Sequence, residues 1–260
     1  MRCAVVGHVE WVEFARVPRM PSAGEIVHAD RVWEEPAGGG AVVARQLALL
    51  AGRCELFTAL GDDALGRDAA RRLAELGIDV HVQWGGVTRR AWTHVDGDGE
   101  RTITVLGDKL LAHGPLPFDG YDLVFFVSGD EESLRAGRHG RFLAATVREL
   151  PTLERAGVEL DLLVASANDP GERYDGSVTT RHVALTDGAQ GGTLDGERYE
   201  AVRVAAIADT YGAGDSFAAA LAFSLARGDD PSVATELAAR AGAAVIAGAG
   251  PYEGQLAFPA

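Results

Sequence analysis

Short apolar runs alternate with segments of helical periodicity along most of this chain. The apolar runs are typical of buried strands. They are Arg2 to Gly7, Cys54 to Leu60, Asp79 to Trp84, Asp122 to Val127, Phe142 to Thr146, Leu160 to Ala165 and His182 to Thr186. Helices are predicted after the glycine loop at 36–40, from 61–66 to Leu76, near Thr152 to Ala156, from Asp215 to about Arg227 and from Pro231 to about Ala247. This rhythm predicts an α/β three-layer sandwich, a mostly parallel central sheet with helices on both faces.

A second kind of pattern appears outside this rhythm. Arg90 to Val95 and Arg101 to Leu106 alternate around Asp96-Gly97-Asp98-Gly99, which predicts a β-hairpin. The stretch at 16–32 contains two prolines and a glycine, which indicates irregular or edge structure. Such a hairpin can pair between subunits, or it can cover a site in a monomer.

The composition excludes several classes of function. The net charge is −14, from 24 basic and 38 acidic side chains, and no basic stripe appears, so we expect no nucleic-acid partner. No apolar run approaches the length of a membrane span, so we expect no membrane partner. The two cysteines, Cys3 and Cys54, are isolated, which fits core residues in a reducing cytoplasm better than a zinc site or a disulfide.

The chain contains a single lysine, Lys109. A Walker A loop needs a lysine after its glycines, and a protein kinase needs a strand lysine beside a glycine-rich loop. Neither pattern is present, so any phosphate must be held by backbone, arginine or metal.

The stretch from Asp209 to Leu221 predicts an anion site, because Gly212-Ala213-Gly214 stands where a loop turns into a helix. Small residues leave the backbone N–H groups open, and a helix start carries partial positive charge. Asp215 follows at once. An acid beside an anion site is explained by a base that takes a proton from the group attacking phosphorus. The alternative is a glycine turn with an Asp cap.

The stretch resembles the second signature of the ribokinase-like (PfkB-type) carbohydrate kinases, Asp-Thr-x-Gly-Ala-Gly-Asp-x-Phe. The matching residues are Asp209, Thr210, Gly212, Ala213, Gly214, Asp215 and Phe217. The resemblance implies that the Gly-Ala-Gly backbone is an anion hole and that Asp215 is the catalytic base. It also implies a single kinase domain over 1–260, with lid segments near 11–33 and 90–106.

Other motifs follow in the family's order. The glycines at 36–40 resemble the first signature, which implies that Gly38 and Gly39 bind substrate; the family's Asn falls on Val42. Gly61-Asp62-Asp63-Ala64-Leu65-Gly66 is also similar, although we favour plain helix-start acids for its carboxylates.

The nucleotide side is predicted from two further loops. Asn168 and Glu172 resemble the family's Asn-x-x-Glu with one extra residue, which makes Glu172 the magnesium-side candidate, with a solvated loop acid as the alternative. Thr186, Gly188 and Gly191 resemble Thr-x-Gly-x-x-Gly, and with Thr210 they are expected to contact ATP.

The acceptor pocket departs from the family's pattern. Relatives commonly carry an Asp five residues after the glycine of the first strand, and here that position is Val12. Glu10 lies on the same strand face as Val12, and Glu13 on the other. We therefore expect Glu10 to bind the substrate in place of the missing Asp, and the acceptor to differ from an ordinary free hexose or pentose.

The resemblance implies an ATP- and Mg²⁺-dependent kinase that phosphorylates a hydroxyl of a sugar-like small molecule in the cytoplasm, with a homodimer through the lid as one possibility. Two alternatives stay open. The first is a nucleoside kinase, and the second is a binding or regulatory protein that kept the fold and lost turnover.

Overall fold

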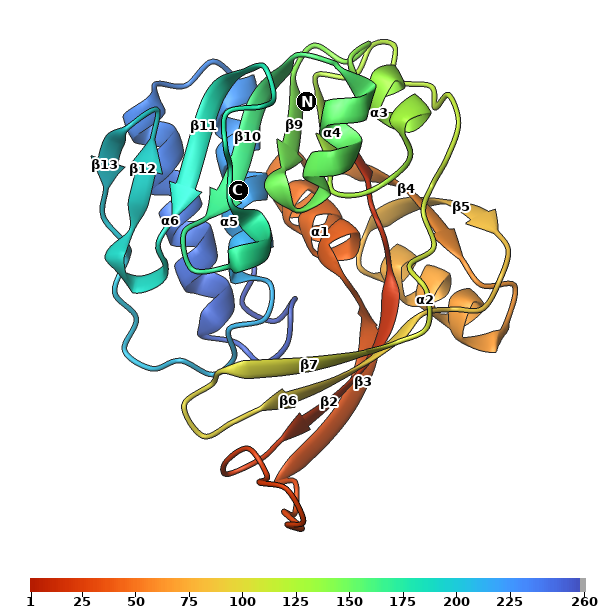
Figure 1. Ribbon diagram of the computed structural model, residues 1–260, viewed down its shortest axis with the longest axis vertical. Coiled ribbons are helices and arrows are strands. Elements are labelled where there is room, and N and C mark those ends of the chain that lie inside the picture. The colour runs from red at the N-terminus through yellow and green to blue at the C-terminus, as the bar shows by residue number, and fades with distance from the viewer. Residues whose placement is uncertain (258–260) are drawn as a thin grey trace.

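The central sheet has nine strands in the computed structural model, which describes residues 1–257 (Figure 1). In spatial order they are β13 (Glu197–Tyr199), β12 (Gly192–Leu194), β11 (Thr180–Thr186), β10 (Leu160–Ser166), β9 (Leu143–Thr146), β8 (Leu123–Phe126), β1 (Cys3–Val6), β4 (Cys54–Leu60) and β5 (Ile78–Trp84). The run from β11 to β5 is parallel, and β12 and β13 extend it as antiparallel strands. Because the strands are parallel, their carboxyl ends share one edge.

Helices cover both faces of this sheet. One layer contains α1 (Gly39–Ala51), α2 (Ala64–Glu75), α5 (Ala213–Ala226) and α6 (Pro231–Ile246), and the other contains α3 (Glu131–Gly137) and α4 (Leu150–Ala156). Successive strand residues divide between the layers, as the side-chain alternation of a strand requires: Val5 packs with α1 and α5, and Val6 with α3 and α4. The predicted three-layer α/β sandwich is therefore confirmed.

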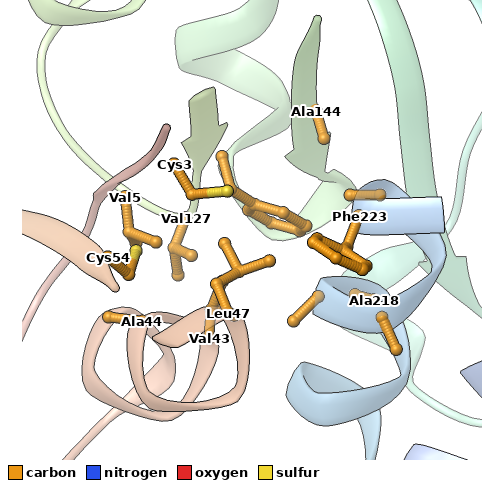
Figure 2. Close-up of a cluster of buried hydrophobic side chains, with 14 of the residues drawn as sticks. Cys3, Val5, Val43, Ala44, Leu47, Cys54, Val127, Ala144, Ala218 and Phe223 are labelled. Atoms are coloured by element: carbon orange, nitrogen blue, oxygen red, sulfur yellow. The ribbon is translucent and has the colours of Figure 1, made fainter. Parts of the chain in front are cut away.

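The core between α1, α5 and the sheet explains why α1 forms where it does. Val43 and Leu47 lie four residues apart on α1 and point at β1 and at Phe223 of α5 (Figure 2). Cys3 and Cys54 lie in the same cluster as free, buried thiols, which confirms that they are core residues. Burial raises the pKa of the Cys3 thiol to about 12, so it stays protonated at neutral pH.

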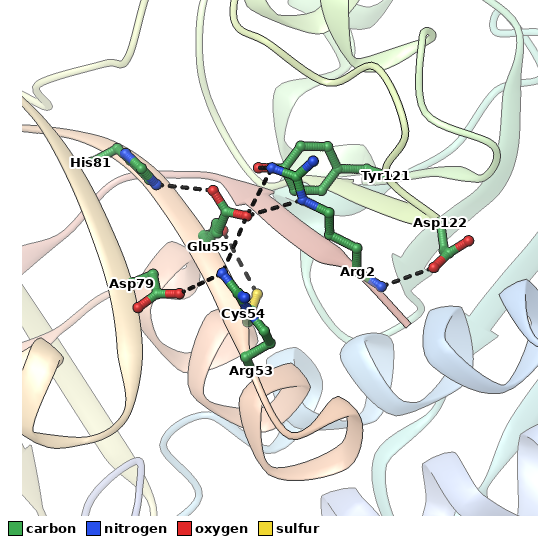
Figure 3. Close-up of polar contacts among 8 residues, drawn as sticks. All are labelled: Arg2, Arg53, Cys54, Glu55, Asp79, His81, Tyr121 and Asp122. Atoms are coloured by element: carbon green, nitrogen blue, oxygen red, sulfur yellow. Dashed lines mark hydrogen bonds and ion pairs between the residues drawn. The ribbon is translucent and has the colours of Figure 1, made fainter.

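A polar network joins Arg2, which precedes β1, to Glu55 near the start of β4 and to His81 in the middle of β5 (Figure 3). Glu55 of β4 accepts hydrogen bonds from Arg2 at 3.2 Å, and its other oxygen lies 3.0 Å from His81 Nε2 of β5. Arg2 also donates to Tyr121 Oη at 2.9 Å. Burial disfavours the ionised form, but hydrogen bonds from Tyr121 and Arg2 outweigh it and lower the pKa of Glu55. The network fastens β1, β4 and β5 to one another.

One helix was not predicted from the sequence. No helix was predicted between the strands at 122–127 and 142–146, whereas α3 occupies Glu131–Gly137. Asp130 caps it by accepting a hydrogen bond from Ser133 N at 2.8 Å. The helix is short enough that no helical period shows in the sequence.

A second, four-stranded sheet lies against the carboxyl edge of the main sheet, and we call it the lid sheet. Its order is β3 (Arg31–Ala37), β2 (Glu10–Arg16), β6 (Arg90–Val95) and β7 (Arg101–Leu106). The predicted lid segments contain most of it, but β3 continues to Ala37, beyond the predicted end near 33.

The two faces of the lid sheet differ. Val12 and Phe14 lie opposite Ala91 and Thr93, and these residues face the body of the molecule. Val12, Phe14 and Ala91 belong to an apolar cluster that includes Val42 of α1 and Tyr211, which precedes α5. Trp92 lies on the other face and is exposed. The lid sheet is therefore attached to the body by its own small core. Among residues 1–257, no helix is long and apolar enough to span a membrane.

Candidate active site

The site is built around the start of α5. Gly212 precedes the helix with φ of +81°, a left-handed conformation, and a Cβ there would lie 3.0 Å from Val42 Cγ1. Gly214 is in the first turn with an ordinary φ, and a Cβ there would meet no atom within 4 Å. The backbone at Gly214 therefore faces open space, and Gly212 provides the turn that aims it there. This fits a phosphate held on backbone N–H groups at a helix start.

Asp209 holds this loop in place. Its carboxylate is buried and accepts hydrogen bonds from Tyr211 N at 2.8 Å and from Gly250 N at 3.0 Å. The hydroxyl of Tyr211 in turn accepts a hydrogen bond from Gly38 N at 3.2 Å. The loop before α5, the loop before α1 and the segment after α6 are thus fixed together.

Asp215 is brought next to the other glycine loop. A Cβ at Gly39 would lie 3.1 Å from Asp215 Oδ1, so only a glycine leaves the carboxylate its place. Burial raises the pKa of Asp215 to about 6. Glu172 adds to this rise, and Arg101 and Arg148 oppose it. A carboxylate with a pKa near neutral, beside an anion-binding helix start, has the property that a general base needs.

The nucleotide side of the site is organised by Arg148, which lies in a 3₁₀ turn after β9. Arg148 Nη2 donates to Glu172 Oε1 at 2.7 Å and contacts Asp169. The charge of Glu172 raises the pKa of Asp215 and that of Arg148 lowers it, so both side chains lie near enough to act on this carboxylate. No group of three potential metal-binding side chains occurs among residues 1–257. Asp169 and Glu172 supply carboxylate oxygens on this loop, the donor type that Mg²⁺ takes together with waters and substrate phosphates.

The remaining nucleotide candidates divide into two sets. Thr186 ends β11 at the carboxyl edge, and Gly188 lies close to the Asn168 side chain. A glycine is required at position 191 by local packing alone, because a Cβ there would lie 2.1 Å from the carbonyl oxygen of Tyr199. Thr210 is engaged by the lid, since Arg101 Nη1 donates to its carbonyl oxygen at 3.0 Å and to its hydroxyl at 3.2 Å.

Glu10, which we expect to bind the acceptor, has a partner that the sequence did not reveal. Glu10 is buried, and its Oε2 lies 3.2 Å from Arg89 Nε. Glu13 lies on the outer face and pairs with Arg90. Val12 and Val42, which occupy the family's polar positions, pack together in the apolar cluster under the lid sheet.

His8 closes the site beside Gly38, whose Cβ would lie 3.1 Å from the ring. Its Nδ1 is 3.0 Å from Ser128 Oγ. Burial lowers the pKa of His8 to about 3, with Lys109, Arg89 and Arg148 adding to the effect, so the ring is neutral. The arginines and His8 were missed from the sequence, because none of them stands in a motif that points to its partner.

Comparison with known proteins agrees with this geometry. The family model described as pfkB family carbohydrate kinase matches residues 1–129 and 156–256. The chain belongs to the pfkB family of carbohydrate kinases. The suspected resemblance to this family is therefore confirmed.

The individual relatives have low sequence identity to this chain. The chain is 29% identical over 178 residues to an ATP-dependent ribose-1-phosphate kinase of Halopiger xanaduensis, a match covering 66% of this chain and 55% of the relative, so it spans about half of that protein's length. Ribokinase from Thermotoga maritima has the same fold, with a TM-score of 0.78 at 20% identity over 99% of this chain and 96% of that one. Arabidopsis thaliana ribokinase, complexed with ribose and ATP, aligns with a TM-score of 0.73 at 21% identity, over 98% and 95% of the two chains.

The pKa of Asp215 leads to a prediction about stability. Its folded-state pKa, about 6, lies above the ordinary value of 3.8, so the ionised carboxylate destabilises the fold above about pH 6. As the pH falls through 6 toward 4, the folded protein takes up a proton and this cost disappears. Asp215→Asn should therefore raise the melting temperature at about pH 8 and have little effect at about pH 4. Thermal unfolding without ligands measures both values.

Asp230→Asn is the matched control, because Asp230 stands exposed at the start of α6. It should shift the melting temperature little at either pH. An equal gain for Asp215→Asn at both pH values would contradict the raised pKa.

Proposed function

We propose that this chain transfers the γ-phosphoryl group of ATP to a hydroxyl of a sugar or sugar-like acceptor. The proposal is supported most strongly by one observation: the carboxylate of Asp215, with a pKa of about 6, lies between the open helix start and the Gly38-Gly39 loop. The family of carbohydrate kinases and the likeness to a ribokinase that binds ribose and ATP agree with it.

Asp215 would take the proton of the acceptor hydroxyl as its oxygen attacks the γ-phosphorus. The new O–P bond forms while the bond from the γ-phosphorus to the β–γ bridging oxygen breaks, and ADP leaves. The N–H groups at Gly212, Ala213 and Gly214 would stabilise the negative charge on the transferred group. Mg²⁺, on the side of Glu172, would neutralise the charge of the nucleotide phosphates.

The lid sheet would exclude water, which otherwise accepts the phosphoryl group. Its cluster with Val42 and Tyr211 already holds it against the body, and Arg101 fastens β7 to Thr210. Thr186, the last residue of β11, and Gly188, in the 3₁₀ turn that follows, would contact ATP.

Incubation with Mg-ATP and a panel of sugars, sugar phosphates and nucleosides, with ADP release as the readout, tests this function. Turnover of nucleosides alone would show that the chain is a nucleoside kinase. Binding of ATP without turnover of any acceptor would favour a binding or regulatory protein. A homodimer through the exposed outer face around Trp92 stays a prediction, which analytical ultracentrifugation can test.

The first prediction from this mechanism concerns Asp215. Asp215→Asn should lower kcat by about 10² to 10⁴-fold, the range for losing a general base, and leave nucleotide binding intact. Steady-state kinetics and nucleotide titration measure the two properties. If the variant turned over substrate at the wild-type rate, Asp215 would be only a helix-start acid. As a control, Asp230→Asn should change neither kcat nor nucleotide binding.

The second prediction concerns the anion site. Mg-ADP at about 100 times its dissociation constant should stabilise the protein by about 2.7 kcal/mol. Gly214→Val should remove most of this gain without unfolding the protein, because its side chain would enter the open space over the helix start. The turn conformation itself depends on Gly212 rather than on Gly214. Equal stabilisation of variant and wild type would place the nucleotide phosphates elsewhere.

A further inference from the structure

The pair of Glu10 and Arg89 is placed on the body-facing side of the lid sheet, at its attachment to the main sheet. Glu10 begins β2, and Arg89 immediately precedes β6, which pairs with β2. The backbone N–H of Trp11 donates to Arg89 O at 2.9 Å, which fixes the two residues side by side. Glu10 and Asp215 both act electrostatically on Tyr211, so the pair lies on the same side of the molecule as the catalytic base.

The contact between these two side chains is incomplete. Arg89 Nε and Glu10 Oε2 lie 3.2 Å apart, yet both atoms are buried without a hydrogen bond of acceptable geometry. A buried charged group without hydrogen bonds is costly, so such a pair in a native site needs an explanation. A ligand that gives Glu10 a hydroxyl donor and gives Arg89 an acceptor would satisfy both.

Arg89 has the capacity to bind such a ligand. Within residues 1–257, the only partner recorded for its guanidinium is Glu10, and that contact involves Nε. The two terminal nitrogens are left to bind a further group. A guanidinium donates two parallel hydrogen bonds to a phosphate or carboxylate, and it stays charged at every physiological pH.

The surroundings also favour an anion. Lys109, the only lysine of the chain, acts electrostatically on both Glu10 and His8, and its Nζ lies 2.7 Å from Glu149. His8 is neutral and adds no charge. The polar groups that would hold an uncharged sugar are replaced by Val12 and Val42, which are fully buried. Recognition at this side therefore depends on charge more than on hydroxyl contacts.

We propose that the acceptor carries a phosphate monoester, which Arg89 binds with its terminal nitrogens while Glu10 accepts a hydrogen bond from an acceptor hydroxyl. The inference rests on the proposed kinase function and narrows its substrate class to sugar phosphates. A phosphate offers two or more oxygens to the free edge of the guanidinium, and Lys109 supplies a second positive charge nearby.

The test compares Arg89→Gln with Arg90→Gln. Arg90 is the adjacent residue on the outer face, where it hydrogen-bonds Glu13, and it serves as the matched control. The acceptors are D-ribose, ribose 1-phosphate, ribose 5-phosphate and D-glucuronate, the last as a carboxylate probe. ADP release gives kcat and KM, and thermal unfolding with each acceptor in the absence of nucleotide gives binding independently of turnover.

The wild type should turn over at least one ribose phosphate with a kcat/KM about 100-fold above that for ribose. Arg89→Gln should raise KM for that substrate by about 10- to 100-fold, the range for a charged hydrogen-bonding group, with kcat changed by less than about 3-fold. Arg89→Lys should recover part of the affinity because it restores the charge. Arg90→Gln should resemble the wild type, and circular dichroism should show the same fold for all variants.

Several results would overturn the inference. They are equal efficiency with ribose and its phosphates, preference for glucuronate, equal effects of the two arginine substitutions, or no ribose phosphate that either reacts or stabilises the protein. Failure of the kinase function looks different: a ribose phosphate would stabilise the wild type but not Arg89→Gln, while no acceptor released ADP.

Discussion

The geometry of this site depends on the left-handed turn at Gly212, which directs the start of α5 toward open space. Three contacts hold it: the buried carboxylate of Asp209 binds Tyr211 N and Gly250 N, and Tyr211 reaches Gly38. A side chain at position 212 would be strained by the left-handed φ of +81° and crowded by Val42. The open donors and the acid beside them are therefore rigidly placed before any ligand arrives, which is what electrostatic catalysis requires.

The lid sheet shares this support. Tyr211 packs edge-on against Phe14, with ring centroids 5.2 Å apart, while its hydroxyl accepts the hydrogen bond from Gly38. Phe14 stacks on Trp33 at 4.8 Å. Tyr211 thus joins the loop before α5, the loop before α1 and the lid strands β2 and β3. A displacement of the lid would disturb the turn before α5, so closure over the site and alignment of its donors are coupled through packing.

Much of this architecture could be predicted from the sequence, because it depends on local signals. The strand–helix rhythm gave the three-layer sandwich, and the glycines and acid of 209–217 identified the helix start. Asp63 was expected to be a helix-start acid, and it is the N-cap of α2, accepting from Gly66 N at 2.8 Å. These features need only neighbours along the chain.

The contributions of the arginines could not be predicted, because their partners are distant in sequence. Arg148 hydrogen-bonds to Glu172. Arg101 hydrogen-bonds from the lid sheet to Thr210, in the loop before α5. Arg89 is placed beside Glu10 only by the parallel pairing of β2 with β6, whose intervening chain contains β3, α1, β4, α2 and β5. Such a pairing leaves no period or spacing in the sequence. The sequence therefore identified the glycines and the acid at the start of α5, and only the fold revealed the charges around Glu10 and Asp215.

The replacement of two polar positions by valine has a structural consequence that the sequence did not suggest. Val12 and Val42 come from a lid strand and from α1, yet they are buried in one cluster with Tyr211. Because both side chains are apolar, they add apolar contact between the lid sheet and the body. The body-facing side of the lid sheet is therefore apolar at Val12 and polar at its attachment to the main sheet, where Glu10 lies beside Arg89.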